Sequence, residues 1–273
     1  MLKARQIKSV GYYTTLANKD DYYHKGKEPA GQWYGKGCEQ FGLTGEVNKQ
    51  DFYAICAGKN PRDLTHKLVM NAGKTGEKGR RPGWDLTFSA PKSVSTLWAS
   101  ADDRTKDLIG KLHDEAVKKA LDYYAESYGA TRTGKEGTAI DRTNKLFFAL
   151  FEHSTSRALD PQLHTHAVMI NLGINPHGQT KSLQTLELYR AEKEIGAFYR
   201  AELAHAMQRQ LGVDVEQGEK GTFEVKGVER GLMKYWSKRR TEIEEAMEQA
   251  GLSGGRASEV IALKTRQVKE YPD

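Results

Sequence analysis

The stretch Phe151-Glu-His153-Ser-Thr-Ser-Arg157-Ala-Leu-Asp-Pro-Gln-Leu-His164-Thr-His166-Ala-Val-Met-Ile-Asn171 is the most informative part of the sequence. Two runs, 145–151 and 163–172, are rich in apolar, aromatic and β-branched residues, which predicts two buried strands. His164 and His166 lie two residues apart on the second strand, so their side chains project to one face about 7 Å apart. His153 ends the first strand, and a hairpin connection would bring it beside them.

Three imidazoles at this spacing can bind one divalent ion. Because three neutral ligands leave coordination positions open, such a site suits Lewis-acid chemistry better than a closed structural site. Two other interpretations stay open: the histidines are hydrogen-bonded residues of the sheet, or the ion is purely structural.

Asp85 is the acidic residue that the sequence places nearest to this chemistry. It begins a further predicted strand, 84–89, and would share a sheet face with Thr87 and Ser89. A carboxylate there can accept a hydrogen bond from an imidazole and fix its tautomer. The alternative is an aspartate that serves a turn or a cap.

The remaining patterns alternate helix and strand without a regular βαβ order. Helical periodicity is found in three stretches, 106–128, 192–211 and 238–250. Gly212 ends the second helix, and Ser237 is a candidate N-cap for the third. Hairpins are predicted in two places, across the turn 175–180 and within 213–225. The sequence therefore predicts an α+β fold with a central antiparallel sheet flanked by helices.

Composition excludes several classes of protein. The chain has 273 residues, with 42 Lys and Arg against 36 Asp and Glu, a net charge of +6. No apolar run approaches the roughly 20 residues that span a bilayer, and the amino terminus lacks the apolar stretch of a secretory signal. With two cysteines only, Cys38 and Cys56, we expect a cytoplasmic protein without disulfides. The mild positive charge permits a polyanionic partner.

Two tyrosine pairs, Tyr12-Tyr13 and Tyr22-Tyr23, lie close together near the amino terminus. Paired aromatic residues usually belong to the core. Tyrosine can also act as a nucleophile, although forming the phenolate at pH 7 costs about 4 kcal/mol because its pKa is near 10. A divalent ion that polarises a phosphate, with a nearby base, can offset that cost.

Taken together, these motifs resemble those of the HUH superfamily of single-strand DNA endonucleases. They are most similar to the relaxase domain of the MobF class of conjugative relaxases, the relaxase-helicases of plasmid transfer. Besides the tyrosine pairs, the similarity rests on the stretches 33–47, 81–95, 153–157, 160–168 and 262–269. The resemblance implies an HUH-like sheet, followed by a C-terminal helical and small-hairpin region that closes over a DNA cleft.

The resemblance also implies roles for individual residues. His153, His164 and His166 would bind the metal, Mg²⁺ or Mn²⁺, with Zn²⁺ or another divalent ion as a possible occupant. Asp85 would orient a histidine and assist deprotonation of the nucleophile. Tyr12 would be that nucleophile, Tyr22 or its twin Tyr23 would serve a second strand transfer, and Arg157 would lie near the scissile phosphate. The expected DNA contacts are basic residues: Lys74, Lys78, Arg80, Arg81, Lys92, Arg266 and Lys269.

The implied activity is site-specific nicking and rejoining of one DNA strand at a plasmid transfer origin. Tyrosine attack would leave a 5′-phosphotyrosine and a free 3′-hydroxyl. The implied partners are single-stranded plasmid DNA with an adjacent hairpin, and other relaxosome and coupling proteins; we expect a monomer without membrane insertion. One relaxase domain is expected over 1–273, with a catalytic core to about 190, a DNA-clamping region from about 191, and the helicase region of a longer protein absent.

The sequence is also compatible with two alternative functions. The first is a rolling-circle replication initiator, which would share the tyrosines and the histidine site, although initiators usually place tyrosine after the histidines. The second is a non-catalytic DNA-binding module that a metal ion holds together, with the tyrosines in its core.

Overall fold

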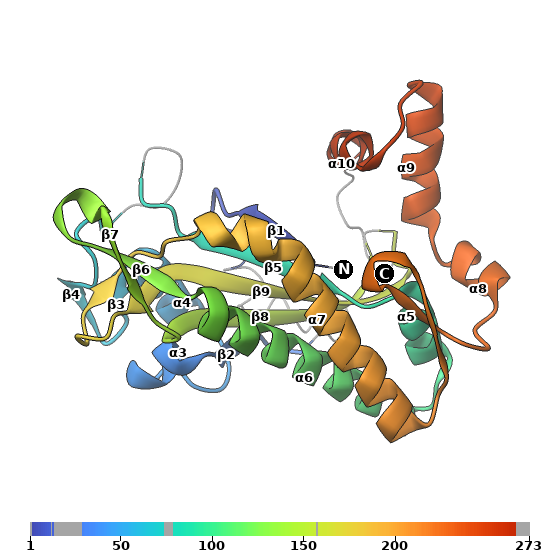
Figure 1. Cartoon of the computed structure of the whole chain (residues 1–273), viewed down its shortest axis with the longest axis horizontal. Helices are drawn as coiled ribbons and strands as arrows, with labels where there is room; N and C mark the ends of the chain where they lie inside the picture. Colours follow the sequence, from blue (N-terminus) through green and yellow to red (C-terminus); the bar gives the residue numbers. More distant parts are fainter. Residues whose placement is uncertain (1, 12, 14–28, 74–78, 157, 266–273) are drawn as a thin grey trace.

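A six-stranded antiparallel sheet forms the centre of the fold (Figure 1). The computed structural model describes residues 2–11, 13, 29–73, 79–156 and 158–265. The strand order is β1-β5-β9-β8-β2, and β10 pairs with the end of β9. The strands are β1 Leu2–Gln6, β2 Gln32–Tyr34, β5 Gly83–Ser89, β8 Leu146–Thr155, β9 Pro161–Ile174 and β10 Thr180–Lys181.

Helices cover both faces of this sheet. Two long helices, α6 (Asp103–Tyr128) and α7 (Leu186–Leu211), lie side by side along one face (Figure 1). The short helices α3 (Lys36–Gln40) and α4 (Lys49–Cys56) pack on the opposite face. The other helices are α5 Lys92–Ser100, α8 Arg230–Tyr235, α9 Lys238–Gln249 and α10 Gly255–Lys264.

Three two-stranded hairpins complete the fold. They are β3–β4 (Lys59–Asn60 and Asp63–Lys67), β6–β7 (Ala130–Thr133 and Ala139–Arg142) and β11–β12 (Val215–Gln217 and Phe223–Val225). In Figure 1 the first two hairpins lie at one end of the sheet, whereas α9 and α10 extend from the other end.

The two faces of β9 belong to two separate cores. Ala167 and Met169 pack with the long helices, whereas Val168 and Ile170 pack with the short helices on the opposite face. Because side chains of a strand alternate between its two faces, and both faces of β9 are buried, the sequence of this strand is continuously apolar. Near the start of β9 the same alternation places the side chains of His164 and His166 on the face that also holds Val168.

The α+β prediction is confirmed. The helix expected over 106–128 begins at Asp103, where the Asp102 carboxylate caps the backbone N–H of Thr105. The helix expected from 192 begins six residues earlier and ends, as predicted, at Gly212, which has a φ of +66°. The hairpin predicted within 213–225 is β11–β12, and the turn after β9 leads into β10.

One capping prediction is wrong. Ser237 does occupy the N-cap position of α9, but its side chain makes no capping hydrogen bond. Its hydroxyl instead donates to the carbonyl oxygen of Met233 at 2.6 Å, in the preceding helix. The serine therefore joins α8 to α9 and leaves the first N–H groups of α9 without a side-chain cap.

None of the helices in the described part of the chain is long and apolar enough to cross a membrane.

Candidate active site

The three histidines meet on one face of the sheet. Antiparallel pairing places His153 of β8 directly opposite His164 of β9, and His166 lies one pleat further along. Each pair of imidazole rings has its centroids 5.3 Å apart. Three imidazoles that bind one ion tetrahedrally through nitrogens at about 2.1 Å have centroids roughly 5.3 Å apart. The spacing of the three rings therefore equals the spacing expected of three histidine ligands around one divalent ion.

For two of the histidines, hydrogen bonds fix which ring nitrogen would bind a metal ion. The Nδ1 atom of His164 lies 2.8 Å from the carbonyl oxygen of Gln162, and the Nδ1 atom of His166 lies 2.8 Å from Oδ2 of Asp85. Both partners accept hydrogen bonds, so each Nδ1 carries the proton and each Nε2 presents its lone pair. Two of the three imidazoles are thus held in the tautomer that a metal ligand requires.

Asp85 is buried beside the histidines and receives several hydrogen bonds. Burial by itself raises the pKa of its carboxyl, but the hydrogen bonds from Nδ1 of His166 and from the hydroxyls of Tyr13 and Thr87 outweigh it, so the net pKa is lowered. The carboxylate therefore stays ionised. Of the predicted roles, this geometry matches the orientation of a histidine, whereas a low pKa makes Asp85 a weak base.

Tyr13 is the tyrosine that the structure describes at this site. Its hydroxyl donates to Oδ2 of Asp85 at 2.7 Å, and its ring meets the edge of His166 at a centroid distance of 6.3 Å. The side chain is 8% exposed and packs in the core beside Phe151. Tyr13 thus lies behind His166, on its Nδ1 side. Tyr12, the predicted nucleophile, lies outside the described residues, as do Tyr22 and Arg157.

The predicted DNA contacts differ in whether the structure describes them and in how exposed they are. Lys74, Lys78, Arg266 and Lys269 lie outside the described residues. Lys92 is half-buried at the histidine end of the sheet, where its Nζ atom donates to the carbonyl oxygen of Pro161 at 2.8 Å and burial lowers its pKa. Arg81 is exposed, with its guanidinium 6.0 Å from the centroid of the Trp84 ring.

Arg80 does not fit the prediction of a DNA contact. Its side chain is 2% exposed, and its guanidinium donates to Cys56, Asn71, Asn171 and Ser182 of the protein itself. Burial lowers its pKa to about 10, which leaves it charged at neutral pH. Arg80 therefore stabilises the fold, and its guanidinium is not available to DNA.

The sequence interpretation missed a buried polar network on the opposite face of β9. Thr165 stands between the two histidines of that strand and points away from them, toward the long helices. Its hydroxyl lies 2.9 Å from Nε2 of His113 in α6, and Nδ1 of His113 lies 2.7 Å from the hydroxyl of Tyr199 in α7. Burial lowers the pKa of His113 to about 3. The available signal was a histidine on the apolar face of a predicted helix.

Comparisons with known proteins identify the class of domain. The model of the TrwC relaxase family matches residues 7–273. The solved structure of the conjugative relaxase TrwC in complex with oriT DNA, metal-bound, has a TM-score of 0.86 at 34% identity, covering 100% of this chain and 93% of that chain. TrwC complexed with a 27-mer DNA that comprises the recognition hairpin and the cleavage site has a TM-score of 0.84 at 33% identity, with the same coverage.

Two curated relatives, both multifunctional conjugation protein TraI, come from Escherichia coli, one of them from strain K12. Each is 35% identical over 290 residues, which cover 100% of this chain and 15% of the relative. This chain therefore spans about 15% of the length of these relatives. Fold and sequence together define a relaxase domain of the MobF class, as the motifs indicated. The chain belongs to the TrwC relaxase family.

Proposed function

We propose that this domain nicks one DNA strand at a plasmid transfer origin and later rejoins it. The observation that carries the proposal is the histidine cluster, with three centroids 5.3 Å apart and an ionised Asp85 behind it. Family membership supports it, because TrwC has been solved with oriT DNA and with DNA that holds a hairpin and a cleavage site.

The proposed reaction is a transesterification. The phenol oxygen of Tyr12 forms a bond to phosphorus while the bond from phosphorus to the 3′-oxygen breaks. The phenol proton passes to a base, and the leaving 3′-oxygen takes up a proton. A divalent ion bound by His153, His164 and His166 would withdraw charge from the phosphate, with Mg²⁺ or Mn²⁺ as the proposed ion. Because the phosphodiester energy is kept in the 5′-phosphotyrosine, the free 3′-hydroxyl can reverse the reaction.

The described residues have supporting roles in this proposal. Asp85 holds the proton on Nδ1 of His166 and so directs Nε2 toward the ion. Tyr13 lies in the core, and its hydroxyl donates a hydrogen bond to the same carboxylate. That hydroxyl therefore points toward Asp85 and not toward a substrate. Of the first tyrosine pair, Tyr12 is therefore the proposed nucleophile. Tyr22 or Tyr23 of the second pair would serve a second strand transfer.

Substrate contacts and partners belong to the same proposal. Arg157 would approach the scissile phosphate, and Lys92 and Arg81 would contact DNA, together with the basic residues outside the described part of the chain, Lys74, Lys78, Arg266 and Lys269. The proposed substrate is single-stranded DNA with an adjacent hairpin, gripped by the region from about residue 191. We further propose that the domain acts as a monomer in the cytoplasm beside relaxosome and coupling proteins, as part of a longer relaxase-helicase.

A denaturing gel tests the proposal. The domain is mixed with its transfer-origin DNA and Mg²⁺ or Mn²⁺, and a covalent adduct is expected for the native protein and for Tyr13→Phe, but not for Tyr12→Phe. His164→Ala should lose cleavage and retain DNA binding. An undiminished adduct in Tyr12→Phe contradicts the assigned nucleophile. If no adduct forms at all and chelation unfolds the protein, a metal-stabilised DNA-binding module is the better description.

A further inference from the structure

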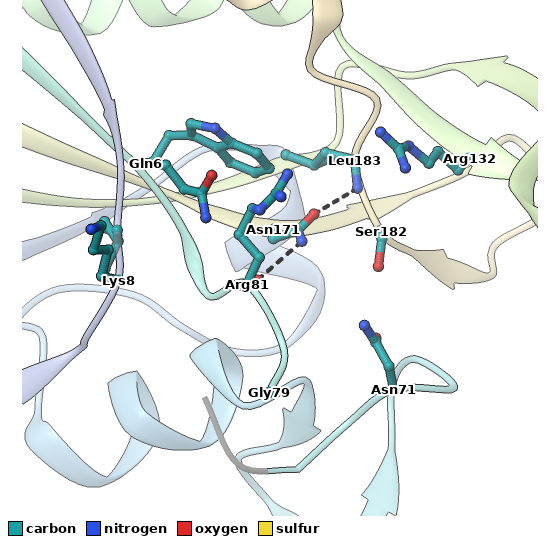
Figure 2. A pocket seen from close by; sticks show the side chains of 11 residues that line it. Gln6, Lys8, Asn71, Gly79, Arg81, Arg132, Asn171, Ser182 and Leu183 are labelled. Atoms are coloured by element: carbon teal, nitrogen blue, oxygen red, sulfur yellow. Dashed lines mark hydrogen bonds between the residues drawn. The ribbon is translucent and has the colours of Figure 1, made fainter. Parts of the chain in front are cut away.

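Figure 2 shows a pocket from close by, with a volume of about 530 Å³. The register of β5 and β9 places it at the end of the sheet away from the histidines. Its lining includes Lys8, Arg81, Trp84, Arg132, Asn171 and Ser182. Trp84 pairs with Met169 of β9, whereas Thr87 pairs with His166. Trp84 and Thr87 are three residues apart on β5, which separates the pocket from the level of His166 by about 10 Å along the strand. The Trp84 side chain packs toward the long helices, on the side of the sheet opposite to the histidines. The pocket is therefore distinct from the candidate active site.

Buried Arg80 ties the walls of this pocket together. Its Nη1 atom donates to the Asn71 side chain at 3.0 Å and to the Ser182 hydroxyl at 3.3 Å, and its Nη2 atom donates to the backbone oxygen of Asn171. All three partners line the pocket. The backbone N–H of Arg132 in turn donates to the backbone oxygen of Ser182 at 2.9 Å. Segments distant in the sequence are thus held in a fixed arrangement.

Asn171 fixes the backbone of the neighbouring Arg81. Its side-chain amide donates to the backbone oxygen of Arg81 at 3.0 Å and accepts from the backbone N–H of Leu183 at 3.0 Å, as the dashed lines in Figure 2 show. Arg80 points into the protein and Arg81 points outward, where its guanidinium lies over the Trp84 ring. The ring limits the positions of the guanidinium before any ligand arrives.

Positive charge converges on the pocket, and no Asp or Glu is among the described residues that line it. Figure 2 shows Lys8 on one side, Arg132 on the other and Arg81 between them, and all three are exposed. Arg80 adds a fourth charge beneath them, and its partners are neutral. Among the residues that the structure describes, no carboxylate forms an ion pair with any of the four. Such a cluster attracts an anion.

We propose that this pocket binds backbone phosphate of the DNA at a position outside the cleaved phosphodiester, with Lys8, Arg81 and Arg132 as its contacts. The inference rests on the proposed function, because it takes its ligand from the DNA that the domain cleaves. Two guanidinium groups offer the paired donors that phosphate oxygens accept, and the lysine adds a point charge. The pocket is also large enough for a nucleotide unit. Sequence reasoning had singled out only Arg81 of these three residues.

The salt dependence of DNA binding tests the inference. Phosphate contacts do not depend on base sequence, so a labelled 20-nucleotide strand and a labelled hairpin of arbitrary sequence serve as probes in fluorescence anisotropy. In the triple variant Lys8→Gln, Arg81→Gln, Arg132→Gln, the slope of log K against log salt should fall by roughly 2 to 3 for at least one probe. The corresponding loss of affinity is roughly 100-fold near 0.1 M salt.

A control variant removes three positive charges elsewhere. Arg104, Lys106 and Lys111 lie in the first turns of α6, and Lys111 is roughly 25 Å along that helix from its last residue, Tyr128. The triple substitution Arg104→Gln, Lys106→Gln, Lys111→Gln should leave the slope within about 0.3 of the native value. The inference is overturned if the pocket variant folds with the native melting temperature and shows the slope of this control for both probes.

Two further arms separate the possible outcomes. Inorganic phosphate and a deoxynucleoside monophosphate are titrated calorimetrically; if they bind in the pocket while the slope for DNA is unchanged, the site serves a small anion and the DNA assignment is wrong. His164→Ala should keep the native slope without forming an adduct, whereas the pocket variant should still form the adduct at low salt and saturating DNA. The experiment thus distinguishes an error in the proposed phosphate site, which changes the expected slope, from an error in the proposed cleavage chemistry, which changes adduct formation.

Discussion

Burial of His113 should make the stability of this domain depend on pH in a defined window. The pKa of His113 is about 3 in the folded chain, against about 6.5 for an ordinary histidine in an unfolded chain. Below pH 6.5 the unfolded chain therefore binds a proton that the folded chain does not. The free energy of unfolding should fall as the pH is lowered through this window, by about 1.4 kcal/mol per pH unit.

The magnitude follows from the same two values. Between pH 6.5 and pH 4.5 the loss from this one residue should be about 3 kcal/mol, and it should reach about 5 kcal/mol below pH 3. The pKa of His113 is low because the imidazole is fully buried. Its two ring nitrogens lie within hydrogen-bond distance of the hydroxyl groups of Tyr199 and Thr165, which are neutral. An imidazolium there would carry a charge that burial keeps from water.

Urea unfolding followed by tryptophan fluorescence measures this effect. The native protein and His113→Gln are compared near pH 8 and near pH 4.5 in the presence of a chelator, which removes any contribution from bound metal. Glutamine retains polar groups at this position but does not titrate. The native protein should lose about 3 kcal/mol more than the variant between the two pH values. Parallel losses, within about 1 kcal/mol, would refute the reasoning; His113→Asn serves as a second variant if glutamine does not fold.

Three further predictions concern single positions. Asp85→Asn removes the charge that holds an imidazole in its metal-binding tautomer, so metal affinity measured by calorimetry should fall roughly 10- to 100-fold; unchanged affinity would contradict that role. Arg80→Met should destabilise the protein by roughly 3 kcal/mol in urea unfolding, because four acceptors lose their donor, whereas Arg81→Met should change stability by less than about 0.5 kcal/mol. In Gly83→Ala the new Cβ would meet a backbone oxygen of β9 at 2.1 Å, so we expect a loss of about 1 to 3 kcal/mol or more. Gly110→Ala, whose Cβ would meet nothing nearer than 3.7 Å inside α6, should instead be neutral or stabilising by up to about 1 kcal/mol, and equal effects of the two substitutions would be the contrary result.

The candidate metal site was largely predictable because it depends on local rules. The period of a strand places His164 and His166 on one face whatever the rest of the chain does. A hairpin is the simplest connection between two adjacent strands, and it brings His153 opposite His164, as the pairing of β8 with β9 confirms. The roles of Tyr12 and Tyr22 rest on the family resemblance and stay predictions.

Adjacent residues of the same type show where sequence reasoning fails. Arg80 and Arg81 look equivalent in the sequence, and both were predicted to contact DNA. Arg80 is buried among acceptors from four other segments, and Arg81 is exposed over Trp84. The two residues stand just before β5, where Asn171 of β9 donates to the backbone oxygens of Arg81 and Pro82 and so holds this segment in one orientation, whatever its residue types.

The sequence by itself determined the class of fold, the strand that carries two of the histidines, and the family, since all three depend on periodicity and on contiguous motifs. The tertiary structure decided which polar side chains are buried and which meet across the sheet. His113 reaches Thr165 across 52 residues, and Arg80 reaches Ser182 across 102. Such contacts are made by segments that only strand register and helix packing bring together, so no local pattern encodes them. The physical reason is that periodicity fixes the face on which a side chain lies, whereas its partner depends on the packing of the whole chain.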